Sequence, residues 1–179
     1  ELDGWAGMTA AGLLVDTALS AQYAALLNSR YTPVHNRVQK MLDEEKFHFQ
    51  YAAGWARRIA QVPGLRGDLL AALRRYLAPA LAWLGRDEAP GMRALVHNGV
   101  VHDEPSALRA RYLAKVGPVL DEIGAAEALG VIRDGGEWTW TGRHDWAGWD
   151  DATRRAGGEL DEETASRARG DKNRALLMD

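Results

Sequence analysis

A regular spacing of side chains in one segment constrains the fold of this chain more than any other feature. Seven positions are separated in turn by three and four residues, namely Val38, Met41, Glu45, His48, Ala52, Trp55 and Ile59. This spacing places the side chains on one stripe of an α-helix and is typical of a face that packs against other helices. Glu45 and His48 lie one turn apart on that stripe, where apolar residues are expected. They are either metal ligands or polar groups tolerated in a packed helix.

The rest of the chain also predicts mainly helices. Three long helices are expected over residues 8–28, 33–60 and 65–84, followed by a short helix within loops and a further helix interrupted near Pro118. The glycine- and tryptophan-rich segment 135–151 predicts a small strand or loop patch. We therefore expect an all-α helical bundle in residues 1–132, followed in residues 133–179 by a small Trp-rich extension and a polar tail.

The composition excludes several classes of function. The chain has no cysteine, which rules out disulfides, zinc–thiolate sites, iron–sulfur clusters and thiol nucleophiles. The net charge of −3 indicates no polycationic face, so nucleic acid is not an expected partner. No apolar run approaches the roughly 18 residues that a membrane span needs, so no membrane is expected either. The lack of cysteine is consistent with a cytoplasmic location.

Asp16 is predicted to lie at the same height along the helical pair as Glu45 and His48. The first helix carries the same spacing, at Leu13, Asp16, Ser20, Tyr23 and Leu27, and Asp16 interrupts that stripe. The tight connection after the first helix makes the two helices antiparallel neighbours. Asp16 and Glu45 are equidistant from a turn between Arg30 and Tyr31, roughly 20 Å away along each helix. The sequence therefore predicts that Asp16, Glu45 and His48 converge.

Two explanations of this convergence remain open from the residues alone. In carboxylate-bridged di-metal sites of four-helix bundles, one helix provides a carboxylate and its neighbour provides Glu-x-x-His, and the pattern occurs twice. Carboxylates bridge and balance two cations, while each imidazole adds one nitrogen. The alternative is a charge network without metal, in which His48 bonds Asp16 or Glu45. A buried carboxylate needs either a cation or a hydrogen-bonding partner, because burying it unpaired costs several kcal/mol.

Longer stretches carry a family resemblance. The segment "LLVDTALSAQYAALLNSRYTPVHNRVQKMLDEEKFHF" resembles the second helical pair of the catalytic subunit of the multicomponent phenylacetyl-CoA epoxidase family, whose fold is ferritin-like. "WTWTGRHDWAGWDDATRRAGGELDEE" resembles that subunit's C-terminal extension. "GVVHDEPSALRARYLAKV" resembles the noncatalytic partner subunit. The resemblance implies a ferritin-like bundle made of the second helical pair and further helices.

The resemblance also implies a function and a ligand set. The chain would be the oxygenase component of a di-iron monooxygenase that epoxidises the ring of phenylacetyl-CoA in phenylacetate catabolism. Asp16, Glu45 and His48 would hold iron, or manganese in its place. A separate reductase would supply electrons, and a structural partner subunit of the same fold would dock on the helical faces in a hetero-oligomer.

The other half of the family's ligand set has no counterpart in this sequence. None of the remaining histidines follows a glutamate by three positions, so the N-terminal helical pair is expected to be missing from the chain. Two further hypotheses follow. The protein is a noncatalytic structural subunit of the same complex, or a ferritin-like metal-binding homodimer in which two copies of Asp16, Glu45 and His48 complete the ligand set.

Overall fold

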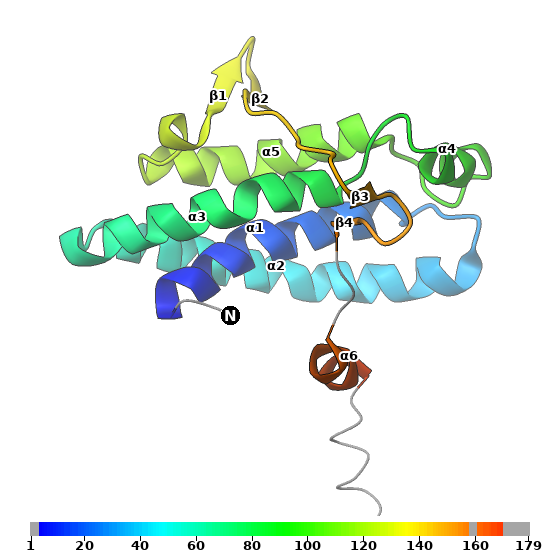
Figure 1. Cartoon of the computed structure of the whole chain (residues 1–179), viewed down its shortest axis with the longest axis horizontal. Helices are drawn as coiled ribbons and strands as arrows, with labels where there is room; N and C mark the ends of the chain where they lie inside the picture. Colours follow the sequence, from blue (N-terminus) through cyan, green and yellow to red (C-terminus); the bar gives the residue numbers. More distant parts are fainter. Residues whose placement is uncertain (1–3, 158–160, 170–179) are drawn as a thin grey trace, which may run out of the picture. The chain divides into compact units, whose positions relative to one another are not determined.

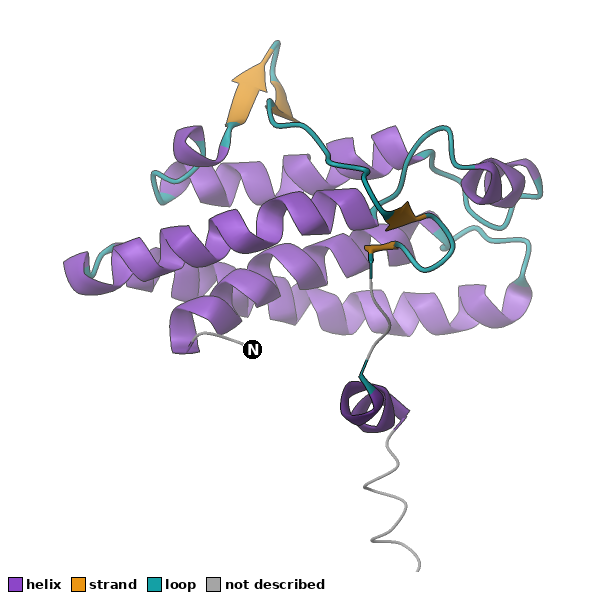
Figure 2. Cartoon of the chain, viewed as in Figure 1, coloured by secondary structure: helices purple, strands orange, loops and turns teal. Residues whose placement is uncertain are grey.

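The computed structural model describes residues 4–157 and 161–169 and confirms an all-α ferritin-like bundle (Figure 1). The chain divides into two compact units, one ending at Asp145 and the other beginning at Trp146. Long helices dominate the first unit (Figure 2). Its elements are α1 (Gly4–Ala25), α2 (Thr32–Ala60), α3 (Pro63–Trp83), α4 (Pro90–His97), α5 (Pro105–Glu122), a 3₁₀ turn (Glu127–Leu129), β1 (Val131–Asp134) and β2 (Glu137–Trp140).

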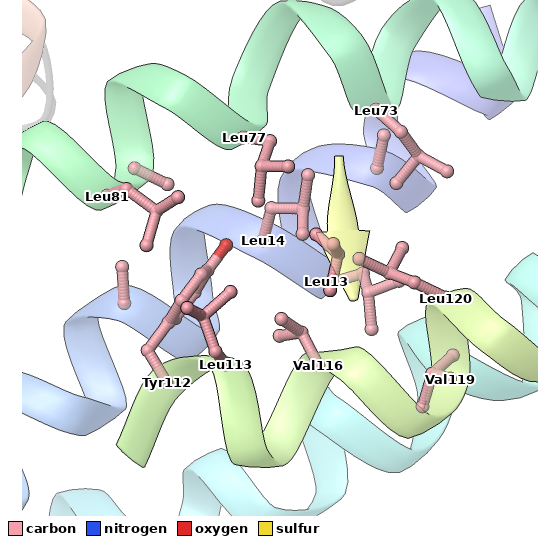
Figure 3. Packing of buried hydrophobic residues seen from close by; sticks show 14 of the residues in the cluster. Leu13, Leu14, Leu73, Leu77, Leu81, Tyr112, Leu113, Val116, Val119 and Leu120 are labelled. Atoms are coloured by element: carbon pink, nitrogen blue, oxygen red, sulfur yellow. The ribbon is translucent and has the colours of Figure 1, made fainter. Parts of the chain in front are cut away.

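Helix α1 is the central element of the first unit and packs against α2, α3 and α5. It is rich in alanine and leucine, and half of its residues are buried, as expected for a helix that is apolar on most sides. Leu13 and Leu14 are fully buried between Leu73 and Leu77 of α3 and the apolar side of α5 (Figure 3). This core holds α1 in place, and with it the residues of the candidate site.

The long helices follow the expected pattern with two differences. Helix α1 begins at Gly4, earlier than expected, because the apolar spacing continues toward the N-terminus through Ala6 and Ala10. Helix α5 runs through Pro118 without the predicted interruption. Pro118 is exposed, so the carbonyl of exposed Ala114 that loses its helical partner can bond water instead. No helix in the described part of the chain is long and apolar enough to cross a membrane.

The hairpin of β1 and β2 belongs to the first unit. The two strands pair antiparallel, with Val131 opposite Trp140. Trp138 lies against α5 at Gly117, where a β-carbon would come within 2.4 Å of the indole. The indole N–H of Trp140 donates a hydrogen bond to the carbonyl of Leu129 at 3.1 Å. These contacts explain why the first unit extends past the boundary at residue 132 that was predicted from the change in composition.

The second unit is small and has local structure of its own. Strands β3 (Trp149–Asp150) and β4 (Arg155–Ala156) form a short antiparallel pair, and α6 spans Glu162–Arg169. Trp146 and Trp149 stack edge to face with ring centroids 5.2 Å apart. A strand patch ahead of a short helix was expected here, and the final part of the predicted polar tail, 170–179, lies outside the described residues.

Candidate metal centre

Three side chains from α1 and α2 meet at one level of the helical pair. The connection between these helices is short, so they lie side by side (Figure 1). Asp16 of α1 and Glu45 and His48 of α2 each offer one ligand atom, and these atoms all lie within 4.8 Å of one another. The predicted convergence of residues that are 29 positions apart in the sequence is therefore present in the structure.

Small side chains let α1 and α2 approach closely beside this cluster. A β-carbon on Gly12 would lie 3.3 Å from the β-carbon of Ala52 and 4.0 Å from a carboxylate oxygen of Asp16. One turn beyond Asp16, the hydroxyl of Ser20 is 3.0 Å from the Asp16 carbonyl and 3.5 Å from Oε2 of Glu45. Small residues thus let the two helices approach on one side of the cluster, and on the other side Ser20 links the Asp16 backbone to the Glu45 carboxylate.

The three residues differ in their exposure to solvent. The side chain of Glu45 is only 13% exposed, whereas that of His48 is 58% exposed. Val38, Ala52 and Ile59 of the predicted stripe are buried, but Met41 and Trp55 are only partly covered. His48 therefore lies at the rim of the packed face and not within it, because no described helix of the first unit covers that side of α2. Glu44 is exposed, as predicted.

The cluster concentrates negative charge in a partly buried place. Burial raises the pKa of Asp16, and the nearby Glu45 carboxylate raises it further, while His48 acts in the opposite direction. Burial also raises the pKa of Tyr23, again with a contribution from Glu45. Nδ1 of His48 lies 3.5 Å from Oε1 of Glu45, which is a long contact for an ion pair or hydrogen bond. The two carboxylates thus favour a nearby cation.

A lysine from α5 joins this environment and was missed in the sequence. Burial lowers the pKa of Lys115, and the charge of Glu45 raises it, so the two groups interact. The ammonium lies 4.6 Å from the ring centroid of Phe49, within the range of a cation–π contact. Leu108, Tyr112, Lys115 and Val119 are spaced four, three and four residues apart, so the same pattern that revealed Glu45 marks Lys115.

A largely apolar cavity of about 390 Å³ adjoins the cluster. Asp16 and His48 are among its lining residues, and aromatic rings form much of its wall. Trp5 and Trp55 stack edge to face there with centroids 5.0 Å apart, and the guanidinium of Arg58 lies 5.8 Å from the Trp55 ring. Polar groups beside an apolar hollow are the usual composition of a small-molecule site.

The donor set suits a hard or borderline cation. Two carboxylates and one imidazole are the ligand types that iron and manganese take in oxygen- and nitrogen-based sites, and neither needs the thiolates that this chain lacks. Helix α1 contributes one carboxylate, Asp16, and helix α2 contributes a Glu-x-x-His pair, Glu45 and His48. This is half of the ligand pattern of ferritin-like di-metal proteins. The residues present therefore fit one half of such a site.

The bundle and this cluster together define a ferritin-like helical protein with a carboxylate–histidine cluster that could bind metal. Residues 1–146 match the family model described as phenylacetic acid catabolic protein, and the chain belongs to that family. No curated protein matches the chain at a significant level. Membership of the family connects the protein with the catabolism of phenylacetic acid.

Proposed function

We propose that the chain is the oxygenase component of a multicomponent di-iron monooxygenase that acts on an aromatic acyl-CoA, with phenylacetyl-CoA as the substrate for 1,2-epoxidation. The observation that carries this proposal is the cluster of Asp16, Glu45 and His48 beside an aromatic-lined cavity. The match to a phenylacetate catabolic family supports the choice of substrate class. Iron is the proposed metal, since the family resemblance implies it.

Each of the three residues has a distinct role in this proposal. Asp16 and Glu45 supply negative charge that balances the cations, and Glu45 is the better shielded of the two carboxylates. His48 supplies a nitrogen ligand from the solvent side. When bound, the iron pair would provide the dioxygen activation that the side chains of this protein cannot.

The cavity suits the aromatic end of the substrate. Trp5, Tyr51 and Trp55 offer ring faces and edges against which a phenyl group can pack. Arg58 lies near Trp55 at this wall and is positioned to meet a coenzyme A phosphate. Arg57 is a weaker candidate for that role because it already pairs with Glu122 at 2.7 Å.

The proposed reaction requires other proteins. The sequence has no flavin or iron–sulfur motif, so a separate reductase would deliver electrons. A structural partner subunit of the same fold would bind the helical faces. Both partners come from the family resemblance and remain part of the proposal.

Metal loading of matched variants tests the proposal. The purified chain is incubated with Fe(II) without oxygen and desalted, and its iron is measured by mass spectrometry. Wild type and Glu44→Ala should retain iron, whereas Glu45→Ala should bind it more than about tenfold more weakly. Glu44 is the control because it is the adjacent acid but faces solvent. Absence of iron from wild type, or equal retention by both variants, would overturn the proposal.

A second candidate function is supported by one observation. Only half of a di-metal ligand set is present in the described residues. A noncatalytic structural subunit of the same complex would have this appearance. Retention of iron by wild type, together with oxygen insertion when a reductase is supplied, would exclude this candidate.

A further inference from the structure

Lys115 is a cationic residue on the packed side of α5. It shares a stripe with Leu108, Tyr112 and Val119, which are all buried, and it is itself only partly exposed. Lysine is seldom placed in this way without a partner, because a charge is costly to withdraw from water. Yet no carboxylate among the described residues forms a direct ion pair with its ammonium. A local salt bridge therefore does not account for this lysine.

Two groups of α2 account for the position of the ammonium. It lies 4.6 Å from the ring centroid of Phe49, which is a cation–π distance. Phe49 follows Glu45 by four residues, so both side chains project from the same face of α2. The negative charge of Glu45 favours the ammonium form of Lys115, against the burial that opposes it. Lys115 thus approaches Glu45 from α5, whereas Asp16 approaches it from α1.

The cluster carries negative charge that the metal-free protein has to balance. Asp16 and Glu45 are both partly buried, and their carboxylates lie close together. His48 balances this charge poorly, because its ring is largely exposed and its Nδ1 is 3.5 Å from Glu45. Lys115 is partly buried, and charges in such places are screened less than charges at the surface. Among the described residues it is therefore well placed to balance Glu45.

We propose that Lys115 is the built-in counter-ion of Glu45 and that its positive charge sets the affinity of the cluster for metal. In the metal-free protein the ammonium attracts Glu45 and offsets part of the negative charge of the cluster. A divalent cation that enters the cluster is repelled by the same ammonium. This inference rests on the proposed metal-binding function and adds a residue of α5 that controls it.

Metal titration of two lysine variants tests the effect on affinity. Lys115→Met keeps a long apolar side chain but removes the charge, so its Kd for Mn(II) should be about threefold to tenfold lower than that of wild type. Lys115→Arg keeps the charge and should bind Mn(II) with about the affinity of wild type. Isothermal titration calorimetry on the full chain measures each Kd.

Lys46→Met is the matched control for the loss of a lysine. Lys46 follows Glu45 directly in the sequence, but it is exposed and pairs with Asp43 at 2.8 Å. Its charge is therefore screened by water and by its own partner. The Kd of this variant for Mn(II) should stay within about twofold of the wild-type value.

A double-mutant cycle without metal tests the attraction between the lysine and the glutamate. Thermal unfolding is followed in EDTA for wild type, Lys115→Met, Glu45→Gln and the double variant. The change in Tm caused by Lys115→Met should be more favourable in the Glu45→Gln background by about 2 °C or more, because no attraction remains to be lost there. The corresponding cycle of Lys46→Met with Glu45→Gln should be additive.

The outcomes separate this inference from the proposed function. Unchanged or weaker binding of Mn(II) by Lys115→Met, equal effects of Lys115→Met and Lys46→Met, or an additive cycle at Lys115 would overturn the role of Lys115 and leave metal binding intact. Failure of the wild type to bind metal would overturn the proposed function and with it the effect on affinity. The metal-free cycle would still decide whether Lys115 balances Glu45.

Discussion

Asp16 and Glu45 come from different helices, yet their carboxylates lie in one cluster within 4.8 Å of a nitrogen of His48. The pKa of Asp16 is raised by burial and by the charge of Glu45, so the ionised form of Asp16 is disfavoured at this place. Proteins keep such pairs where a cation or a proton is part of the function. The effect of altering Asp16 should therefore depend on whether metal is present.

Asp16→Asn should have opposite consequences with and without metal. Because the folded-state pKa of Asp16 is raised, its ionisation opposes folding once the pH exceeds the unfolded value of 3.8. Metal-free Asp16→Asn should therefore melt at a higher temperature than wild type at pH 7. In calorimetry with Mn(II), Asp16→Asn should instead melt at a lower temperature than wild type. Metal at 100 times its Kd stabilises wild type by about 2.7 kcal/mol, and the variant should lose most of this gain. A lower Tm of the metal-free variant would contradict this expectation.

Gly117→Ala should destabilise the first unit although alanine favours helices. The new β-carbon would lie 2.4 Å from Cδ2 of Trp138, so the hairpin would have to move away from α5. We expect a net loss of about 1–3 kcal/mol in urea unfolding, with a change in tryptophan fluorescence. Gly54→Ala is the control, because no atom lies within 4 Å of its β-carbon, and it should gain about 1 kcal/mol. Similar effects of both substitutions would show that Trp138 does not constrain Gly117.

The contribution of Asp87 to the free energy of unfolding should decline at acid pH. Partial burial raises its pKa, but the backbone N–H of Ser106, at 2.7 Å, and the Arg109 guanidinium outweigh burial and hold the pKa below its usual value. A lowered carboxyl pKa stabilises the fold above the unfolded value of 3.8, and this stabilisation is lost as the pH falls through the folded value. Asp87→Asn should cost about 1 kcal/mol at pH 7, since the side chain is partly exposed.

Urea titrations from pH 7 to pH 3 measure this loss. The difference in unfolding free energy between wild type and Asp87→Asn should shrink as the pH falls below 3.8. Glu88→Gln, a change at the exposed neighbouring acid, should differ little from wild type throughout. A difference at Asp87 that is constant over the whole range would rule out the ionised carboxylate as its source.

The candidate site was largely predictable, because helix periodicity and a short turn determine which residues of two antiparallel helices lie at the same height. Asp16 and Glu45 are equidistant from the turn, and this alone places them together. The exposure of His48 was not predictable in the same way. Helix α2 carries two adjacent apolar stripes, and spacing cannot tell which of them other helices cover.

The misjudged details have local physical causes. Pro118 does not interrupt α5 because it faces solvent, where a lost backbone bond can be replaced by water. The hairpin joins the bundle through Trp138 and Gly117, a contact between segments whose composition gives no sign of it. Lys115 shares a stripe of α5 with Leu108, Tyr112 and Val119, so helix periodicity predicts its place on the packed side of that helix.

The contact between Gly12 and Ala52 has a consequence for metal affinity. Because these small residues set the separation of α1 and α2, the distance between Asp16 and Glu45 is determined by backbone packing and not by the ion. The conformational entropy that would be lost in bringing the ligands together is thus lost when the chain folds and not when a metal binds. A cation that binds here would meet a preorganised pair of carboxylates, and none of its binding energy would be needed to bring them together.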